Sequence, residues 1–362
     1  MLAHERRGSG PALVLIHGIG SRRQVWEPVL AELARHREVI ALDLPGFGRS
    51  PLWPEPGSPP TPGDQPTPRN AATAHAATTP GHQPTPRSAT TPSHEPTPHG
   101  ATTPHAATAP GHQAAPRSAT SPHAAITPDH QATPRSPGSP HAATAPDDRM
   151  VPRDAVVPGS VGHLADQVAA FLDQLGLERP ELAGSSLGGG IALELGRRGR
   201  AAAVTAFAPV GFWGPAGRRW CQAVVGGSRA LSTALAPALP RLLATRAGRI
   251  ALCSIFYGHP GRLSPEDCLA SARALSSAPG FAAARRAFGI WRLPIGADPG
   301  ALGGIPVTIA WGTRDVVLPH RRQSARAREE LPAARHVLLP GCGHLPFADD
   351  PARCAELLTV RQ

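Results

Sequence analysis

The chain has 362 residues, of which 41% are apolar and 17% charged, so it is long enough to bury a sizeable core. Its formal net charge of +10 rests on arginine alone, because the sequence contains no lysine. The arginines stand in scattered pairs without interleaved aromatic residues, which argues against a nucleic-acid-binding surface.

The cysteines and the hydrophobic pattern limit where the protein works. Five cysteines show neither metal-ligand spacing nor the even number typical of a disulfide framework. The amino terminus lacks an apolar signal segment, and the chain has no apolar run of about 18 residues that could span a membrane. These patterns predict a cytoplasmic protein without a membrane span or a metal site.

The first 50 residues predict a strand, a helix and a further strand. Residues 2–7 have the pattern of a short edge strand, and 12–16 form the continuous apolar run of a buried strand. Residues 25–36 carry apolar side chains at helical spacing, and 38–42 return to a strand pattern. Residues 43–50 then predict a turn-rich loop at the carboxyl end of that strand.

The composition changes abruptly in residues 51–158, which hold more than half of the 44 prolines. A unit of 18 residues, H-A-A-T-T-P-G-H-Q-P-T-P-R-S-A-T-T-P at 75–92, recurs in this stretch. Its repeats carry almost no large apolar side chain, so they cannot offset the entropy of ordering. The sequence therefore predicts a disordered insertion. Its regularly spaced histidines predict no metal site, because nothing holds them in a fixed geometry.

Regular structure is expected again from Pro158. Ser160 is a suitable N-cap for a helix that Gly176 ends. A short strand then leads into G-S-S-L-G at 184–188, and a helix follows it. The glycines of G-x-S-x-G give the backbone room for a sharp turn that projects the hydroxyl of Ser186 above a sheet. Residues 201–208 are a further apolar strand.

Strands and helices alternate less regularly in the residues after 208. Residues 212–291 predict helices around 228–248, 265–276 and 280–290, and their aromatic side chains suit an apolar pocket or a small second core. Strands are predicted at 305–311 and 336–339, and helices at 320–331 and 350–360. The alternation of strands and helices before and after 212–291 predicts an α/β fold with a doubly wound, mostly parallel sheet.

Three predicted strands end at residues with reactive side chains. Ser186, Asp315 and His344 each follow a strand, and reacting groups of parallel sheets gather beyond the carboxyl ends of the strands. A serine hydroxyl needs an imidazole to take its proton, and the imidazole needs a carboxylate to hold its tautomer. The order and spacing of these residues permit all three roles.

Five motifs together resemble the α/β-hydrolase fold superfamily, in particular its capped, serine esterase or lipase-like members. They cover residues 1–52 and 155–362 and read L-V-L-I-H-G-I-G (13–20), D-L-P-G-F-G-R-S (43–50), G-S-S-L-G-G (184–189), W-G-T-R-D (311–315) and G-C-G-H-L-P (341–346). Two features depart from the family. The chain starts late, so the family's first strand is not expected, and the 51–158 insertion replaces a short loop.

The resemblance implies a role for each site residue. Ser186 would be the nucleophile, His344 the general base and Asp315 the acid that orients it. The backbone N–H groups of Ile19 and Leu187 would form the oxyanion hole. A second set would shape the elbow and the oxyanion turn: Gly184, Gly188, His17 and Gly18.

Other residues compete for these roles. Asp43, Asp349 and Asp350 are rival acids, but their places in the chain do not fit the family's order of serine, acid and histidine. Ser185 occupies the variable position of the motif. In the related epoxide hydrolases and haloalkane dehalogenases the nucleophile at this position is aspartate, so Ser186 argues against those activities.

These features predict a cofactor-independent serine hydrolase that acts on a small-molecule carboxylic ester or similar acyl compound with an apolar part, through an acyl-enzyme. The alternatives are a lactonase, a carbon–carbon bond hydrolase or an acyltransferase with the same triad, a ligand-binding or signalling protein with negligible turnover, and an interaction protein that works through its repeats. The oligomeric state stays open. The predicted parts are a first core segment (1–52), the insertion (53–157), a second core segment with the elbow (158–211), a helical cap (212–300) and a last core segment with the acid and the histidine (301–362).

Overall fold

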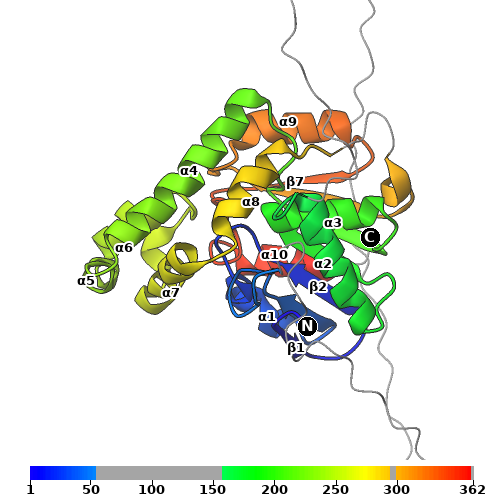
Figure 1. Ribbon diagram of the computed structural model, residues 1–362, viewed down its shortest axis with the longest axis horizontal. Coiled ribbons are helices and arrows are strands. Elements are labelled where there is room, and N and C mark those ends of the chain that lie inside the picture. The colour runs from blue at the N-terminus through cyan, green and yellow to red at the C-terminus, as the bar shows by residue number, and fades with distance from the viewer. Residues whose placement is uncertain (54–156, 294–298, 360–362) are drawn as a thin grey trace, which may run out of the picture. The chain divides into compact units, whose positions relative to one another are not determined.

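Seven strands form one sheet in the computed structural model, which describes residues 1–53, 157–293 and 299–359 (Figure 1). Their order is β1-β3-β2-β4-β5-β6-β7, and only β1 runs antiparallel to its neighbour. The strands are β1 (His4–Arg7), β2 (Ala12–Ile16), β3 (Glu38–Leu42), β4 (Glu181–Ser185), β5 (Ala203–Phe207), β6 (Val307–Gly312) and β7 (Arg335–Leu339). The predicted doubly wound, mostly parallel sheet is therefore confirmed.

Both faces of the central strands are buried, which explains why strands such as β2 are continuous apolar runs, whereas the outer strands β1 and β7 carry charged residues. Along β2, Val14 and Ile16 pack on one face, while Leu13 and Leu15 pack on the other. Burial of each such side chain contributes roughly 1.5–3 kcal/mol, so the sheet centre dominates the stability of the fold. The first face is covered by α2 (Val161–Gln174), α3 (Leu187–Arg197) and α9 (His320–Glu330), and the second by η1 (Arg23–Trp26), α1 (Glu27–Leu33) and α10 (Pro351–Thr359).

The helix that precedes the elbow begins and ends as its sequence predicts. Ser160 has extended backbone angles, and its Oγ accepts a hydrogen bond of 3.1 Å from the N–H of His163. Gly176 follows the helix with φ of 71°, a conformation that costs glycine little. These two ends fix the length of α2, which leads through a short turn into β4.

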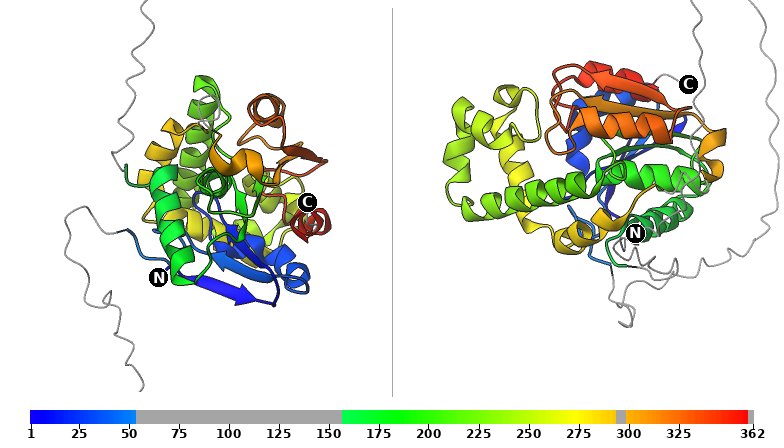
Figure 2. Two further views of the ribbon diagram at one scale, coloured as in Figure 1. Left: turned by 90° about the vertical axis from the view of Figure 1, so that its right-hand side faces the viewer. Right: turned by 90° about the horizontal axis from the view of Figure 1, so that it is seen from above.

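A helical cap separates β5 from β6 and projects to one side of the sheet (Figure 2). Its elements are α4 (Pro215–Ala234), α5 (Leu239–Ala244), α6 (Arg246–Cys253), η2 (Pro260–Arg262), α7 (Pro265–Ser277), α8 (Phe281–Ala287) and η3 (Phe288–Ile290), and η4 (Gly300–Gly304) precedes β6. The helix predicted around 228–248 is wrong, because α4 begins at Pro215 and two short helices follow it. Pro240 lies in the first turn of α5, and Thr245 Oγ1 accepts from the Gly248 N–H at 3.0 Å and starts α6.

The predicted insertion at 53–157 lies outside the described residues except at its two ends. Trp53 is buried and meets the ring of His163 edge-on, with 5.2 Å between the ring centroids. The chain therefore leaves the core beside the start of α2, where it also returns. Among the described residues, no helix combines the length and the apolar character needed to cross a membrane.

Candidate active site

Ser186 occupies a strained turn between β4 and α3. Its backbone angles are φ 55° and ψ −113°, which residues other than glycine rarely adopt. The Ser186 N–H donates to Phe207 O at 2.9 Å, and the Ser186 carbonyl accepts from the N–H groups of Gly190 and Val210, both at 3.1 Å. These bonds hold the serine at the carboxyl end of β4 in the strained conformation.

The two glycines of the motif are required by close backbone contacts. A Cβ atom on Gly184 would lie 2.1 Å from the Gly188 carbonyl oxygen, and one on Gly188 would lie 2.2 Å from the Ile16 carbonyl oxygen. No side chain fits at either distance. Gly18, after β2, also approaches the serine, because a Cβ atom there would lie 3.1 Å from Ser186 Cβ. The loop after β2 therefore packs directly against the serine.

His344 and Asp315 meet at the ends of the two neighbouring strands. Asp315 follows β6, His344 follows β7, and His344 Nδ1 lies 2.8 Å from Asp315 Oδ2. The other carboxylate oxygen of Asp315 accepts from the Leu318 N–H at 2.8 Å. Both residues are buried. The carboxylate is thus fixed by the chain and accepts the Nδ1 proton, which leaves Nε2 as the basic nitrogen.

The Ser186 hydroxyl is placed at the same edge of the sheet but makes no hydrogen bond to His344 within the described residues. Ser186 is 4% exposed, so only a small part of its surface reaches solvent or the neighbouring cavity. Contacts between nucleophile and base commonly tighten only when substrate is bound. The structure thus joins two of the three predicted residues directly and positions the third at the carboxyl end of β4, which β5 separates from β6.

His17 has no free nitrogen with which to act as a base. Its Nδ1 lies 2.7 Å from the carbonyl oxygen of Gly18, and its Nε2 accepts from the Leu44 N–H at 2.9 Å. The ring is fully buried, and this burial lowers the pKa of His17. A neutral imidazole with both nitrogens occupied holds the loop after β2 against the loop after β3.

In the described part of the chain, none of the three rival aspartates has a hydrogen bond or ion pair with His344. Asp43 accepts from the backbone N–H groups of Arg23 and Arg49 at 2.7 and 2.9 Å, and it also pairs with the guanidinium of Arg23. Asp350 accepts from the Arg353 N–H at 3.0 Å and caps α10.

Ser185 ends β4 with a buried hydroxyl that has no hydrogen-bond partner among the described residues. Asp43, Asp350 and Ser185 each lie in the framework around the site.

Asp349 has a role that the sequence does not indicate. Its fully buried carboxylate accepts from the N–H groups of Gly258 and His259 in the cap, both at 2.7 Å, and from the Gly343 N–H at 2.8 Å. Gly343 directly precedes His344. The carboxylate therefore joins the cap to the loop that carries the imidazole. Its partners are backbone groups, which leave no signal in a sequence.

Comparisons with known proteins agree with this architecture. A family model described as alpha/beta hydrolase fold matches residues 11–210, more than half of the chain. The chain belongs to the alpha/beta hydrolase fold family. Epoxide hydrolase EphH of Mycobacterium tuberculosis is 33% identical over 204 residues, which cover 54% of this chain and 92% of that protein.

Two further similarities are either short or limited to the fold. Pimeloyl-[acyl-carrier protein] methyl ester esterase of Aeromonas salmonicida is 52% identical over 48 residues, 13% of this chain and 19% of that protein. The solved structure of a hydrolase from Pseudomonas aeruginosa PA01 has a TM-score of 0.55 at 16% identity, over 98% of this chain and 91% of that one. The first similarity covers a short segment of each protein, and the second shows the fold alone.

The hydrolase offers two backbone donors beside Ser186. Leu187 is the first residue of α3, so its N–H has no acceptor within the helix. The Ile19 N–H also has no acceptor among the described residues. Both belong to segments that pack directly around Ser186. The same edge of the sheet holds no metal cluster, since no group of three or more potential metal-ligating side chains occurs in the described part of the chain.

A cavity of about 620 Å³ lies between the cap and the loops after β2 and β7. It reaches Ile19 on one side and Leu345, next to His344, on another. Its cap wall is mainly aliphatic and includes Leu231, Leu235, Leu239, Leu243, Leu252 and Leu263. A space of this size and character suits a small molecule with an apolar part.

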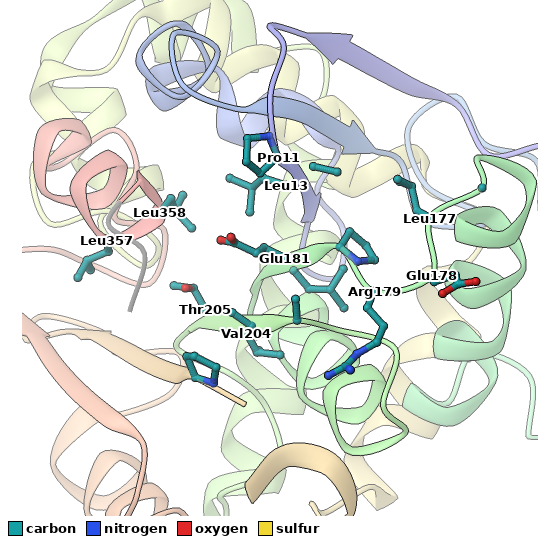
Figure 3. Close-up of a pocket in the computed structure, with 17 residues that line it drawn as sticks. Pro11, Leu13, Leu177, Glu178, Arg179, Glu181, Val204, Thr205, Leu357 and Leu358 are labelled. Atoms are coloured by element: carbon teal, nitrogen blue, oxygen red, sulfur yellow. The ribbon is translucent and has the colours of Figure 1, made fainter. Parts of the chain in front are cut away.

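A second cavity, of about 550 Å³, lies at the opposite end of the strands (Figure 3). It is lined by the starts of β2, β4 and β5, among them Leu13, Glu181 and Val204. Ser186 lies five positions after Glu181, which corresponds to roughly 16 Å along β4. The second cavity therefore lies away from the predicted reacting groups, whereas the cavity beneath the cap is lined by Ile19 and by Leu345, the residue after His344.

Proposed function

We propose that this protein is a serine hydrolase that cleaves a carboxylic ester or a similar acyl compound, with Ser186 as nucleophile, His344 as general base and Asp315 as orienting acid. The observation that carries the proposal is the 2.8 Å contact between His344 Nδ1 and Asp315 Oδ2 at the same sheet edge as the strained Ser186 turn. A serine on such a turn has little other structural purpose, because the strain costs stability.

The proposed reaction runs through an acyl-enzyme. His344 Nε2 accepts the hydroxyl proton as Ser186 Oγ attacks the carbonyl carbon, and the N–H groups of Ile19 and Leu187 stabilise the oxyanion. The protonated imidazole then gives its proton to the departing alcohol. Water attacks the remaining Ser186 ester while His344 takes a proton from it, and the acid leaves as the imidazole passes that proton to Ser186 Oγ.

Epoxide hydrolysis is the second candidate, because the relative that is 33% identical is named an epoxide hydrolase. The chemistry of the nucleophile separates the two candidates. A carboxylate that opens an epoxide leaves an ester, which water cleaves, whereas Ser186 would leave an ether, which the same site does not hydrolyse. Ser186 thus favours acyl transfer to water over epoxide opening.

One experiment distinguishes these candidates and also tests for activity itself. Wild-type protein and the Ser186→Ala variant are treated with a fluorophosphonate probe and assayed with p-nitrophenyl acetate, butyrate and octanoate, and with styrene oxide. We expect the wild type alone to be labelled and to release p-nitrophenol, without diol formation. Absence of labelling and of ester turnover would refute the proposal, and diol formation would favour the second candidate. Thermal unfolding of both proteins checks that alanine at φ 55° leaves the fold intact.

A further inference from the structure

Arg22 brings a positive charge into the cavity beneath the cap. It lies three residues after Ile19, in the extended segment before η1, and it lines the cavity. Its side chain is half-buried and has no hydrogen bond or ion pair within the described residues. The adjacent Arg23 differs, because its guanidinium pairs with the buried carboxylate of Asp43. Of two neighbouring arginines, one holds the loop together and the other faces the cavity.

No other charge of the cavity neutralises Arg22. Among the described residues that line it, Arg22 is the single cation, and Glu27 and Asp267 are the acids. The Glu27 carboxylate pairs with the Arg7 guanidinium at 3.0 Å, and Asp267 Oδ2 lies 2.7 Å from the Ser264 hydroxyl at the start of α7. Both acids therefore have partners of their own, whereas the Arg22 guanidinium has none among the residues that the structure describes.

An unpaired guanidinium beside an aliphatic wall loses part of its hydration without compensation. A bound carboxylate would replace that hydration, because the planar fork of arginine matches the two carboxylate oxygens. A phosphate dianion fits less well, since a single cation would have to balance two charges next to two acids. The chemistry of this wall therefore indicates a carboxylate.

We propose that Arg22 forms a carboxylate subsite, so that the preferred substrate is an ester whose aliphatic chain ends in a free carboxylate, such as the monoester of an aliphatic dicarboxylic acid. This inference rests on the proposed ester cleavage at Ser186. The Cα atoms of Ile19 and Arg22 are at most about 11 Å apart, so one chain reaches from the oxyanion donors to the guanidinium. The leucines of the cap wall would contact its methylene groups.

The test compares the hydrolysis of two matched methyl esters. Monomethyl suberate carries the free carboxylate, and methyl octanoate is its neutral counterpart of equal acyl length. The variants are Arg22→Met, which removes the charge but keeps the length, Arg22→Lys, which keeps the charge, and Gln24→Met. Gln24 lines the same cavity from the same loop, so its variant controls for a changed wall.

We expect the wild type to have a KM about tenfold or more lower for monomethyl suberate than for methyl octanoate, as a charge-assisted hydrogen bond provides. Arg22→Met should raise the KM for monomethyl suberate by a similar factor. It should leave the kcat for monomethyl suberate, and both kcat and KM for methyl octanoate, nearly unchanged. Arg22→Lys should recover part of the loss, and Gln24→Met should affect the two esters equally. Added salt should raise the KM of the wild type for monomethyl suberate, but not the KM of Arg22→Met for the same ester.

Equal KM values for the two esters in the wild type, or equal effects of Arg22→Met on both, would overturn the subsite. Failure of the proposed function gives a different pattern, with no probe labelling and no turnover of any ester. In that case titration calorimetry measures the binding of monomethyl suberate, which does not require ester cleavage. Binding to the wild type but not to Arg22→Met would support the subsite. Absence of suberate binding to the wild type would then refute it.

Discussion

The sheet and the cap differ in how tightly their residues are held. In the sheet, both faces of β2 are buried, and the glycines of the elbow admit no added atom. In the cap, α6 has no buried residue, and the separate cluster between α5 and α7 contains three: Leu239, Leu243 and Cys268. The rigid part holds the proposed reacting groups, and the looser part forms most of the cavity wall. Chemistry and substrate selection should therefore respond to different substitutions.

The largest expected effect follows from replacement of Asp315. Asn can still accept from the Leu318 N–H, but it cannot hold the imidazole in the tautomer that accepts the serine proton. We expect Asp315→Asn to lower kcat for p-nitrophenyl butyrate by about 10⁴-fold with little loss of thermal stability. Asp43→Asn serves as the control, because it weakens bonds to Arg23 and Arg49 and should lower stability but retain most activity. A loss of less than tenfold for Asp315→Asn would assign the acid elsewhere.

The same substitution at Gly188 of the elbow, at the start of α3, and at one glycine of the cap tests the difference in packing. In Gly188→Ala the new methyl group would lie 2.2 Å from the Ile16 carbonyl oxygen, so we expect a loss of about 3 kcal/mol or more. Gly227 lies within α4 with no atom within 4 Å of an added Cβ. Gly227→Ala should stabilise the protein by about 0.5 to 1 kcal/mol. Urea unfolding measures both, and equal effects would contradict the comparison.

Asp349 should affect both regions, because it joins them. Asn at this position keeps one acceptor but turns an amide N–H toward backbone donors of the cap and of Gly343. We expect Asp349→Asn to destabilise the protein by about 1 to 3 kcal/mol and to lower kcat as well, since Gly343 precedes His344. The matched control is Asp350→Asn, which alters only the cap of α10. A variant that loses stability but keeps kcat would show that the link does not position His344.

Low pH should lower the free energy of unfolding through His17, which lies in the loop after β2. Burial lowers the pKa of His17 below its ordinary value of 6.5, so the unfolded chain binds this proton at a higher pH than the folded one. Stability should consequently fall as the pH drops through 6.5, by at most about 1.4 kcal/mol per pH unit for this one group. Urea unfolding of the wild type and of His17→Gln at about pH 7.5 and about pH 5.5 measures the difference. The variant should lose part of the dependence, while burial of His163 contributes in the same direction.

The sequence predicted the sheet better than the cap for physical reasons. Strand β2 was predicted and found at 12–16, because a strand buried on both faces is a continuous apolar run. Helix α4 was placed too late, since its only buried residues are Cys221 and Val225, which give little periodicity. The order of Ser186, Asp315 and His344 was readable because each follows a strand.

The unpredicted parts of the site depend on contacts between distant segments. Asp349 binds backbone groups of Gly258, His259 and Gly343, and any residue would offer the same N–H groups. Arg22 and Arg23 look alike in the sequence, but only the fold brings Asp43 to one of them. Pairing and cavity lining arise from tertiary packing, which local patterns do not encode.

The smallest expected effect concerns the cap wall. Leu231 is 49% exposed and lines the cavity, whereas Leu242, 37% exposed, does not. Replacement of either leucine by alanine should cost no more than about 0.5 kcal/mol of stability, because each side chain is already partly exposed to water. Leu231→Ala should lower kcat/KM several-fold for p-nitrophenyl octanoate but not for the acetate, whose acyl group is too short to reach the wall. Leu242→Ala should leave both esters unchanged. If Leu231→Ala lowered the rates of both esters equally, the cap would be supporting the reacting groups themselves. The sheet would then not act alone in holding the reacting groups, and the cap would not act only in substrate selection.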